Sequence, residues 1–172
     1  MALLERLPYC APEAWVVSGC LFQSAWNHLT GRPPDHGILD YDVFYFDDGD
    51  VSWEAEDAII RRVAEACADL SINVEVRNQA RVHLWYEQKF GMPYPPLLGV
   101  RDSIDRFLAT ACMVGIRADG TAAPAVYAPA GLSDLEALIV RPNRAPNFSP
   151  LRYGEKAARW GATWPELTII PA

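Results

Sequence analysis

The chain has little positive charge and no long apolar segment, and both shortages exclude certain classes of binding partner. Its 172 residues carry 15 lysines and arginines against 22 aspartates and glutamates, a formal net charge of −7. An extended basic surface for duplex nucleic acid or an anionic membrane is therefore not expected. No apolar run approaches the roughly 20 residues that span a bilayer, and the opening segment lacks the apolar core of a signal peptide. We expect a cytoplasmic protein with no membrane partner.

The cysteines are few and widely spaced: Cys10, Cys20, Cys67 and Cys112. They form no Cys-x-x-Cys motif and have no nearby pair of histidines, so the spacing does not indicate a zinc site. We expect reduced thiols that pack as small hydrophobic side chains. Only Cys20 has a second interpretation, because it directly follows a Ser-Gly turn. A nucleophilic thiol there would need a base that the sequence does not announce.

Internal repeats and low-complexity tracts are also lacking, and 51% of the residues are hydrophobic. These properties predict one domain that covers residues 1–172. The hydrophobic periodicity and the turn residues predict helices and strands that alternate along the chain. The predicted helices begin after Ser18 and at Ser52 and cover residues 78–90, 103–110 and 151–160, and the predicted strands cover residues 38–46, 72–77, 113–117 and 125–127. The fold class is therefore α+β, with a mixed or antiparallel sheet covered by helices.

Two carboxylates mark the strand predicted at residues 38–46. Successive side chains of a strand point to opposite faces, so Asp40 and Asp42 share one face. Glu75 joins them if its strand is the neighbour with matching faces. Grouped carboxylates are unfavourable without a cation, and oxygen-only ligands suit Mg²⁺ or Mn²⁺. We therefore take Asp40, Asp42 and Glu75 as candidate metal ligands and catalytic residues.

Ser18 and Gly19 form a turn that leads into a predicted helix. The N–H groups of a helix N-terminus bind phosphate, and glycine allows a close approach. With the carboxylates, this turn would make a two-metal site for phosphoryl transfer. Each part also has an ordinary explanation. Asp-x-Asp occurs at solvated strand ends, Ser-Gly caps helices, and Glu75 beside Arg77 is compatible with a surface ion pair.

The order of turn, helix, Asp-x-Asp strand and later strand carboxylate resembles the nucleotidyltransferase superfamily that includes DNA polymerase β. More closely, the chain resembles a family of small bacterial nucleotidyltransferase-like proteins. The resembling segments cover residues 26–31, 39–47, 74–85, 110–117, 128–135, 159–160 and 164–165, and the most specific is Asn78-Gln-Ala-Arg-Val-His83. The resemblance implies a polymerase β-like fold with Asp40, Asp42 and Glu75 at the metal positions and Ser18-Gly19 at the triphosphate turn.

One departure from the family pattern concerns the residues after this turn. The family has an Arg-Asn pair there, whereas this chain continues Gly19-Cys20-Leu21, so a cation near the phosphates is missing from the pattern. Further along, Asn78 and Gln79 are candidates to bind a base or sugar edge, and Arg81 to bind phosphate. The alternative is that these three orient local backbone and cap the helix. Tryptophans are expected mainly in packing roles, namely Trp26, Trp85, Trp160 and Trp164.

Three functions remain open at this point. The first is Mg²⁺-dependent transfer of a nucleoside monophosphate from a nucleoside triphosphate to a hydroxyl of a small molecule or a protein. The second is a catalytically silent nucleotide-binding or protein-interaction module of the same fold. The third is a metal-dependent phosphohydrolase that uses water as the nucleophile. The net charge of −7 argues against duplex nucleic acid as a partner.

Overall fold

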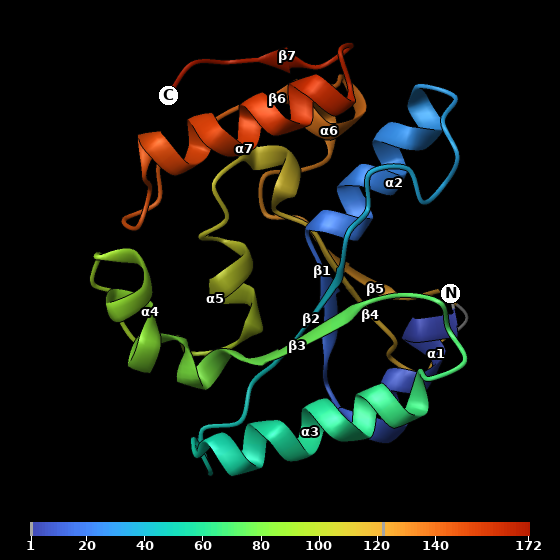
Figure 1. The fold of residues 1–172 in the computed structure, drawn as a ribbon, viewed down its shortest axis with the longest axis vertical. Coiled ribbons are helices and arrows are strands. Elements are labelled where there is room, and N and C mark those ends of the chain that lie inside the picture. The colour runs from blue at the N-terminus through green and yellow to red at the C-terminus, as the bar shows by residue number, and fades with distance from the viewer. Residues whose placement is uncertain (1, 122) are drawn as a thin grey trace.

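The computed structural model describes residues 2–121 and 123–172. The first half of the chain contains α1 (Ala2–Cys10), β1 (Trp15–Val17), α2 (Gly19–Leu29), β2 (Tyr41–Tyr45), α3 (Trp53–Ala66), β3 (Val74–Asn78), the 3-10 helix η1 (Gln79–Arg81) and α4 (Val82–Phe90). The second half contains α5 (Val100–Ile104), the 3-10 helix η2 (Thr110–Cys112), β4 (Gly115–Arg117), β5 (Ala125–Tyr127), α6 (Ser133–Glu136), β6 (Ile139–Val140), α7 (Pro150–Thr163) and β7 (Thr168–Ile169) (Figure 1). Within the described residues, no helix has the length and apolarity to cross a membrane.

Five strands form one mixed sheet in the order β3-β2-β1-β4-β5. β2 and β3 run parallel, whereas β1 pairs antiparallel with both β2 and β4. β4 and β5, which lie within the strands predicted at residues 113–117 and 125–127, form an antiparallel pair. β6 and β7 pair separately as a two-stranded parallel sheet. The predicted α+β fold with a mixed sheet and covering helices is confirmed.

Helices α1 and α3 cover one side of the five-stranded sheet, which we call the closed face (Figure 1). Val16, Val43 and Val76 form a buried row across β1, β2 and β3, because their registers place them opposite one another. Leu7 of α1 and Val63 of α3 belong to the same apolar cluster. α3 begins where the sequence predicts, since the N–H of its third residue donates to Oγ of Ser52 at 3.2 Å.

The other side of the sheet, which we call the open face, carries the alternate residues of the same strands. Part of it is covered by α5, whose Ile104 packs with Trp15 and Val17 of β1. A Cβ at Gly115 of β4 would meet Cδ1 of Ile104 at 2.7 Å, so a larger residue there would force Ile104 to move. The rest of the open face carries Asp42 and its neighbours.

A second core lies away from the sheet, between α2 and α7 (Figure 1). Trp26, Trp160 and Trp164 are buried in it, which confirms the packing roles predicted for them. Nε1 of Trp164 donates to Oδ1 of the buried Asn27 at 2.8 Å. Nδ2 of Asn27 in turn donates to the carbonyl oxygens of residues 34 and 36, at 3.1 and 2.8 Å. The long connection between α2 and β2 is thereby fixed to this core.

Two elements differ from the sequence-based predictions. α1 was not predicted, although Leu3, Leu4 and Leu7 give it a buried stripe. The predicted helix at residues 103–110 is wrong, because α5 ends at Ile104. Nδ2 of Asn143 donates to the carbonyl oxygens of residues 105 and 107, each at 2.8 Å, and Ala109 forms an isolated antiparallel bridge. These tertiary contacts hold the segment in a non-helical path.

Candidate active site

The three predicted carboxylates lie at one end of β2 and β3. Asp42 pairs with Glu75 in the parallel register, so the neighbouring strands have matched faces, as the sequence analysis required. Adjacent strands are about 4.8 Å apart, which puts these side chains next to each other on the open face. Asp40 precedes β2 by one residue and shares the face of Asp42.

The Ser18-Gly19 turn meets these carboxylates at the start of α2. Its position follows from the sheet, because Val17, the last residue of β1, pairs with Asp42. A Cβ placed on Gly19 would lie 3.9 Å from Oδ1 of Asp40. The N-terminal N–H groups of an 11-residue helix are thus beside the carboxylates, where the helix dipole favours a phosphate.

Ser18 occupies the N-cap position of α2, but its side chain makes no capping hydrogen bond within the described residues. Its φ of 52° and ψ of −113° lie in a region that residues with a Cβ rarely adopt. Such a conformation costs on the order of 1–3 kcal/mol and is typical of functional turns. The N–H of Ser18 donates to the carbonyl oxygen of Val114 at 2.9 Å, which anchors the turn to the chain before β4.

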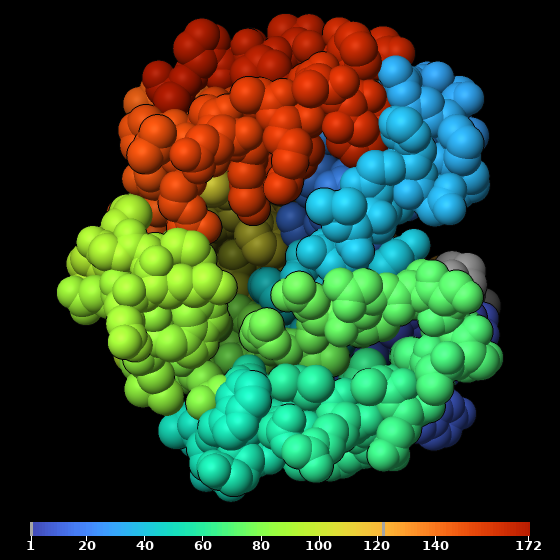
Figure 2. Space-filling model, in the orientation of Figure 1, coloured from blue at the N-terminus to red at the C-terminus, as the bar shows by residue number. Residues whose placement is uncertain are grey.

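Two cavities open beside the carboxylates, in the hollow that Figure 2 shows between α7, α4 and β3. The first, of about 400 Å³, is lined by Ser18, Gly19, Asp40, Asp42 and Glu75, together with residues of α7 and the loop before η2. The second, of about 260 Å³, shares Ser18 and Asp42 with the first and extends toward α4 and α5. All five residues of the predicted metal site and phosphate turn therefore surround one cavity.

Burial and neighbouring negative charges both raise the pKa of Asp42. Burial, with smaller contributions from the neighbouring charges of Asp40 and Glu75, raises the pKa of its carboxyl to about 6, while Lys156 and Arg77 oppose the shift. A divalent cation would relieve this repulsion, and the oxygen-only donor set fits Mg²⁺ or Mn²⁺. Among the described residues, no three His, Cys, Asp or Glu side chains converge closely enough to hold a metal ion. The oxygen donors therefore suit a divalent cation, although the described side chains do not already form a set of metal ligands.

Cys20 does not have the properties of a nucleophile. Its side chain is buried, and burial, with smaller contributions from Asp42 and Asp40, raises the pKa of the thiol to about 12. Thiolate is the reactive form, so the thiol is inert at neutral pH. All four cysteines are free and buried, as the sequence predicts.

The cations of α7 are not among the residues predicted from the sequence. Lys156 lines both cavities, Arg159 lines the first and Arg152 the second. Their spacing of four and three residues puts them on one side of the helix, next to the buried stripe that contains Tyr153 and Trp160. This spacing was visible in the sequence, but only the fold shows that α7 crosses the phosphate turn. α7 therefore places cations in the cavities beside the Ser18-Gly19 turn, whereas the sequence has none directly after Gly19.

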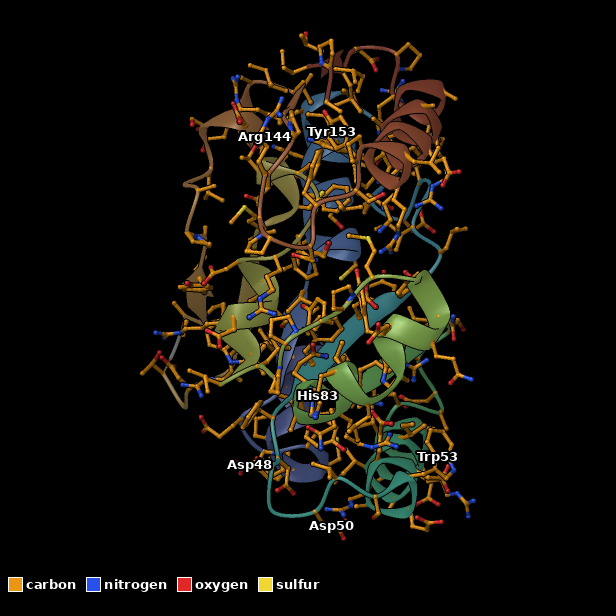
Figure 3. All side chains as sticks on the ribbon, turned by 90° about the vertical axis from the view of Figure 1, so that its left-hand side faces the viewer. Asp48, Asp50, Trp53, His83, Arg144 and Tyr153 are labelled. Atoms are coloured by element: carbon orange, nitrogen blue, oxygen red, sulfur yellow. The ribbon has the colours of Figure 1, made fainter. Side chains whose placement is uncertain are left out.

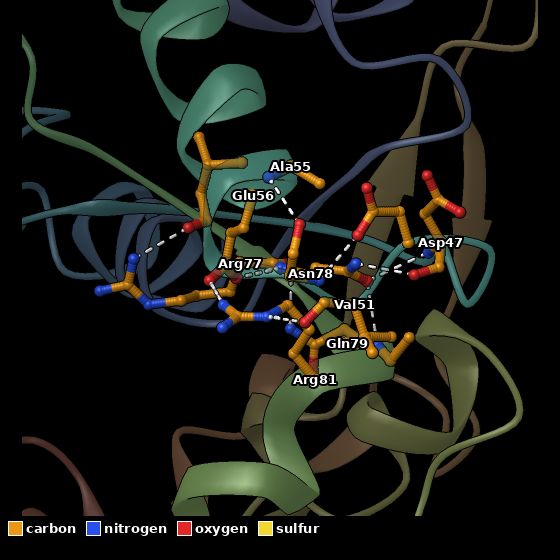
Figure 4. Close-up of polar contacts among 12 residues, drawn as sticks. Asp47, Val51, Ala55, Glu56, Arg77, Asn78, Gln79 and Arg81 are labelled. Carbon is orange, nitrogen blue, oxygen red and sulfur yellow. Dashed lines mark hydrogen bonds and ion pairs between the residues drawn. The ribbon is translucent and has the colours of Figure 1, made fainter.

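The three candidate nucleotide-binding residues after β3 have different surroundings (Figure 4). Oδ1 of Asn78 accepts from the N–H groups of Asp47 and Ala80, each at 3.0 Å, and its Nδ2 donates to the carbonyl of Asp47 at 2.8 Å. Arg81 forms an ion pair with the buried Glu56, and its Nε donates to the carbonyl of Val51 at 2.8 Å. Asn78 and Arg81 therefore hold backbone segments together, and neither lines the two cavities beside the carboxylates.

Gln79 is the one of the three that reaches the site. It is buried, lines the second cavity, and donates from Nε2 to the carbonyl of Arg77 at 3.3 Å. Glu56, in the first turn of α3, is a buried acceptor, because its Oε1 receives the N–H of Asn78 at 2.8 Å.

The mixed sheet, the phosphate turn and the carboxylates on neighbouring strands define a polymerase β-type nucleotidyltransferase fold. A family model described as "Nucleotidyltransferase" matches residues 9–169, and the chain belongs to this nucleotidyltransferase family. A comparison with curated proteins found no match. The solved structures include one similar chain, described as an NMR structure that "reveals a CCA-adding enzyme head domain". It matches with a TM-score of 0.77 and 22% identity over 100% of this chain and 89% of that chain, which shows a shared fold.

Proposed function

We propose that this protein transfers a nucleoside monophosphate from a nucleoside triphosphate to a hydroxyl group of an acceptor. The observation that carries the proposal is the single cavity that joins the Ser18-Gly19 turn to Asp40, Asp42 and Glu75. Family membership supports nucleotidyl transfer as the class of reaction. Mg²⁺ or Mn²⁺, held by the three carboxylates, would neutralise charge on the phosphates and polarise the reacting phosphorus.

The terminal phosphates would lie at the start of α2. The hydroxyl of Ser18 and the backbone N–H groups after it would donate to phosphate oxygens. Lys156 and Arg159 line the same cavity and would supply the positive charge that the phosphates need. Gly19 has no side chain that could block the approach of a phosphate to the helix end, and a Cβ there would lie 3.9 Å from Oδ1 of Asp40.

The reaction follows from this placement. The acceptor oxygen forms a bond to the α-phosphorus, the bond from that phosphorus to the α–β bridging oxygen breaks, and pyrophosphate leaves. The proton of the acceptor hydroxyl passes to a neighbouring carboxylate of the site. The second cavity, which contains Asp42 and Gln79, would accommodate the nucleoside, with Gln79 able to contact its base or sugar.

The direct test is calorimetric titration of the protein with each nucleoside triphosphate, with and without Mg²⁺. We expect Mg²⁺-dependent binding that is lost in Asp42→Asn, because this change removes one carboxylate without altering side-chain shape. The matched control is Asp48→Asn, at an exposed aspartate in the turn after β2 that lines neither cavity (Figure 3). It should bind like the wild type.

Turnover then separates the alternatives. Labelled nucleotide appearing on a hydroxyl acceptor supports transfer. Metal-dependent binding without any product supports the silent nucleotide-binding module, and nucleotide hydrolysis without an acceptor supports a phosphohydrolase. Failure to bind any triphosphate with Mg²⁺ would overturn the proposed function.

A further inference from the structure

A third cavity, of about 450 Å³, lies between the first turn of α3, α4 and the end of β3. We call it the tryptophan site, and its principal lining residues are Trp53, Arg77, Arg81, Trp85, Gln88 and Lys89. It shares Arg77 and Trp85 with the second cavity beside the carboxylates. A ligand in the tryptophan site would therefore lie next to the proposed nucleoside cavity.

The two indoles of this site differ in exposure: Trp53 is largely exposed, whereas Trp85 packs in part against an apolar cluster. Trp53 is 55% exposed on the first turn of α3, where Figure 3 shows it near α4. Trp85 is partly buried and lines the same cavity from α4. An exposed tryptophan that lines a cavity offers a flat face on which another planar ring can stack. By contrast, Trp26, Trp160 and Trp164 are buried in the second core.

Cations lie over these indole rings. The guanidinium carbon of Arg81 is 5.7 Å from the ring centroid of Trp53, and Nζ of Lys89 is 5.5 Å from that of Trp85. Arg81 is neutralised by its ion pair with Glu56. Lys89 and Arg77 supply the remaining positive charge, so the tryptophan site is locally positive on a chain with a net charge of −7.

Arg77 connects the tryptophan site to the carboxylates. Its guanidinium is 3.6 Å from Glu75, and both side chains are more than 40% exposed, so this ion pair is weak and leaves Arg77 able to contact an anion. Arg77 and Glu75 lie two residues apart on one face of β3, roughly 7 Å along the strand. A group bound by Arg77 is thus close to the proposed reaction centre.

We infer that the tryptophan site binds a nucleotide unit at the end of a single-stranded polynucleotide, with its base stacked on Trp53 or Trp85 and its phosphate on Lys89 and Arg77. This inference rests on the proposed function in one respect, because it makes that nucleotide the acceptor. Exposed indoles beside cations suit single strands, whose bases are free to stack, whereas the bases of a duplex are already stacked on each other. The absence of an extended basic footprint agrees with a contact to one or two nucleotides.

The test measures binding of a fluorescently labelled single-stranded RNA hexamer by anisotropy, without Mg²⁺ and without triphosphate. We expect Trp53→Ala to weaken binding about tenfold or more, because one stacked base is lost. Lys89→Gln should weaken binding and reduce its dependence on salt, because one phosphate contact is lost. The matched control is Arg144→Gln, an exposed cation in the other half of the molecule (Figure 3), which should leave affinity unchanged. Trp53 is exposed, so its replacement should not unfold the protein.

Competition identifies the ligand. An unlabelled hexamer that displaces the probe far better than adenosine monophosphate supports the polynucleotide end, while equal displacement assigns the site to free nucleotides. Displacement only by a phosphotyrosine peptide, no binding of the hexamer, or full affinity in Trp53→Ala would overturn the inference.

Asp42→Asn should bind the hexamer normally. If that variant and the wild type both bind RNA but neither binds triphosphate, the proposed function fails while the tryptophan site stands.

Discussion

The two faces of the central sheet show how one set of strands serves stability on one side and chemistry on the other. The closed face is a continuous apolar layer in which the row Val16, Val43 and Val76 is buried under α1 and α3. The open face carries Asp42 and Glu75 in the next register positions of β2 and β3. The same backbone hydrogen bonds fix both layers, so the closed face positions the carboxylates.

Two unfavourable features of the molecule lie together on the open face. Ser18 has a rarely populated backbone conformation, and the pKa of Asp42 is raised by burial and by like charges. Clustering of this kind is typical of a functional site, where a ligand compensates the local cost. We therefore expect changes on the closed face to alter stability alone, and changes on the open face to alter binding and, in one case, to increase stability.

The largest effect on stability should come from the closed face. Leu7→Ala removes a side chain that is 1% exposed in α1, and we expect it to lower the free energy of unfolding by about 3 kcal/mol. Chemical denaturation measures this loss, with the exposed Leu98→Ala as the control that should change little. Triphosphate affinity of the folded variant should stay as in the wild type. A large loss of affinity without a loss of stability would contradict the division between the faces.

A smaller effect, of opposite sign, should come from Asp42→Asn. The pKa of this carboxyl is raised from 3.8 to about 6 in the folded state, so the folded protein holds the proton more tightly than the unfolded chain. The resulting cost is absent below about pH 4 and fully present above about pH 6. Without metal at pH 8, the variant should be more stable by about 2 kcal/mol, allowing for partial screening by solvent.

Thermal or chemical denaturation across pH 4–8 checks this prediction, with Asp48→Asn as the control. The gain should disappear at pH 4, and Mg²⁺ should stabilise the wild type at pH 8 more than the variant. A gain of equal size at both pH values would mean that charge repulsion at Asp42 is not its cause.

The smallest of these effects concerns α7. Lys156→Gln removes a cation that lines both cavities, and we expect about tenfold weaker triphosphate binding, close to 1.4 kcal/mol. Because Lys156 opposes the raised pKa of Asp42, that pKa should rise further in the variant. Calorimetry and a pH titration of Asp42 measure the two consequences. Unchanged affinity would remove α7 from the phosphate site, and Arg144→Gln serves as the matched control.

Much of the placement of the site carboxylates could be predicted from local sequence patterns. Alternation along β2 and β3 placed Asp40, Asp42 and Glu75 on one face, and the register confirms that the faces match. The predicted roles of these residues in catalysis and metal binding stay predictions. The roles proposed for Asn78 and Arg81 also stay predictions, although their hydrogen bonds to residues 47, 51, 56 and 80 favour the alternative of local support.

The sequence by itself determined the α+β class, the strand that carries Asp42 and the turn at Ser18-Gly19, because strand alternation and turn chemistry act over a few neighbouring residues. Only the tertiary structure decided that α7 brings Lys156 and Arg159 to that turn, that Glu56 is buried with Arg81, and that the segment after Ile104 leaves the helix. These outcomes depend on contacts between residues far apart in the chain. Local periodicity reports which side of an element is apolar, but it does not specify which distant element will cover that side or which charged groups will then meet.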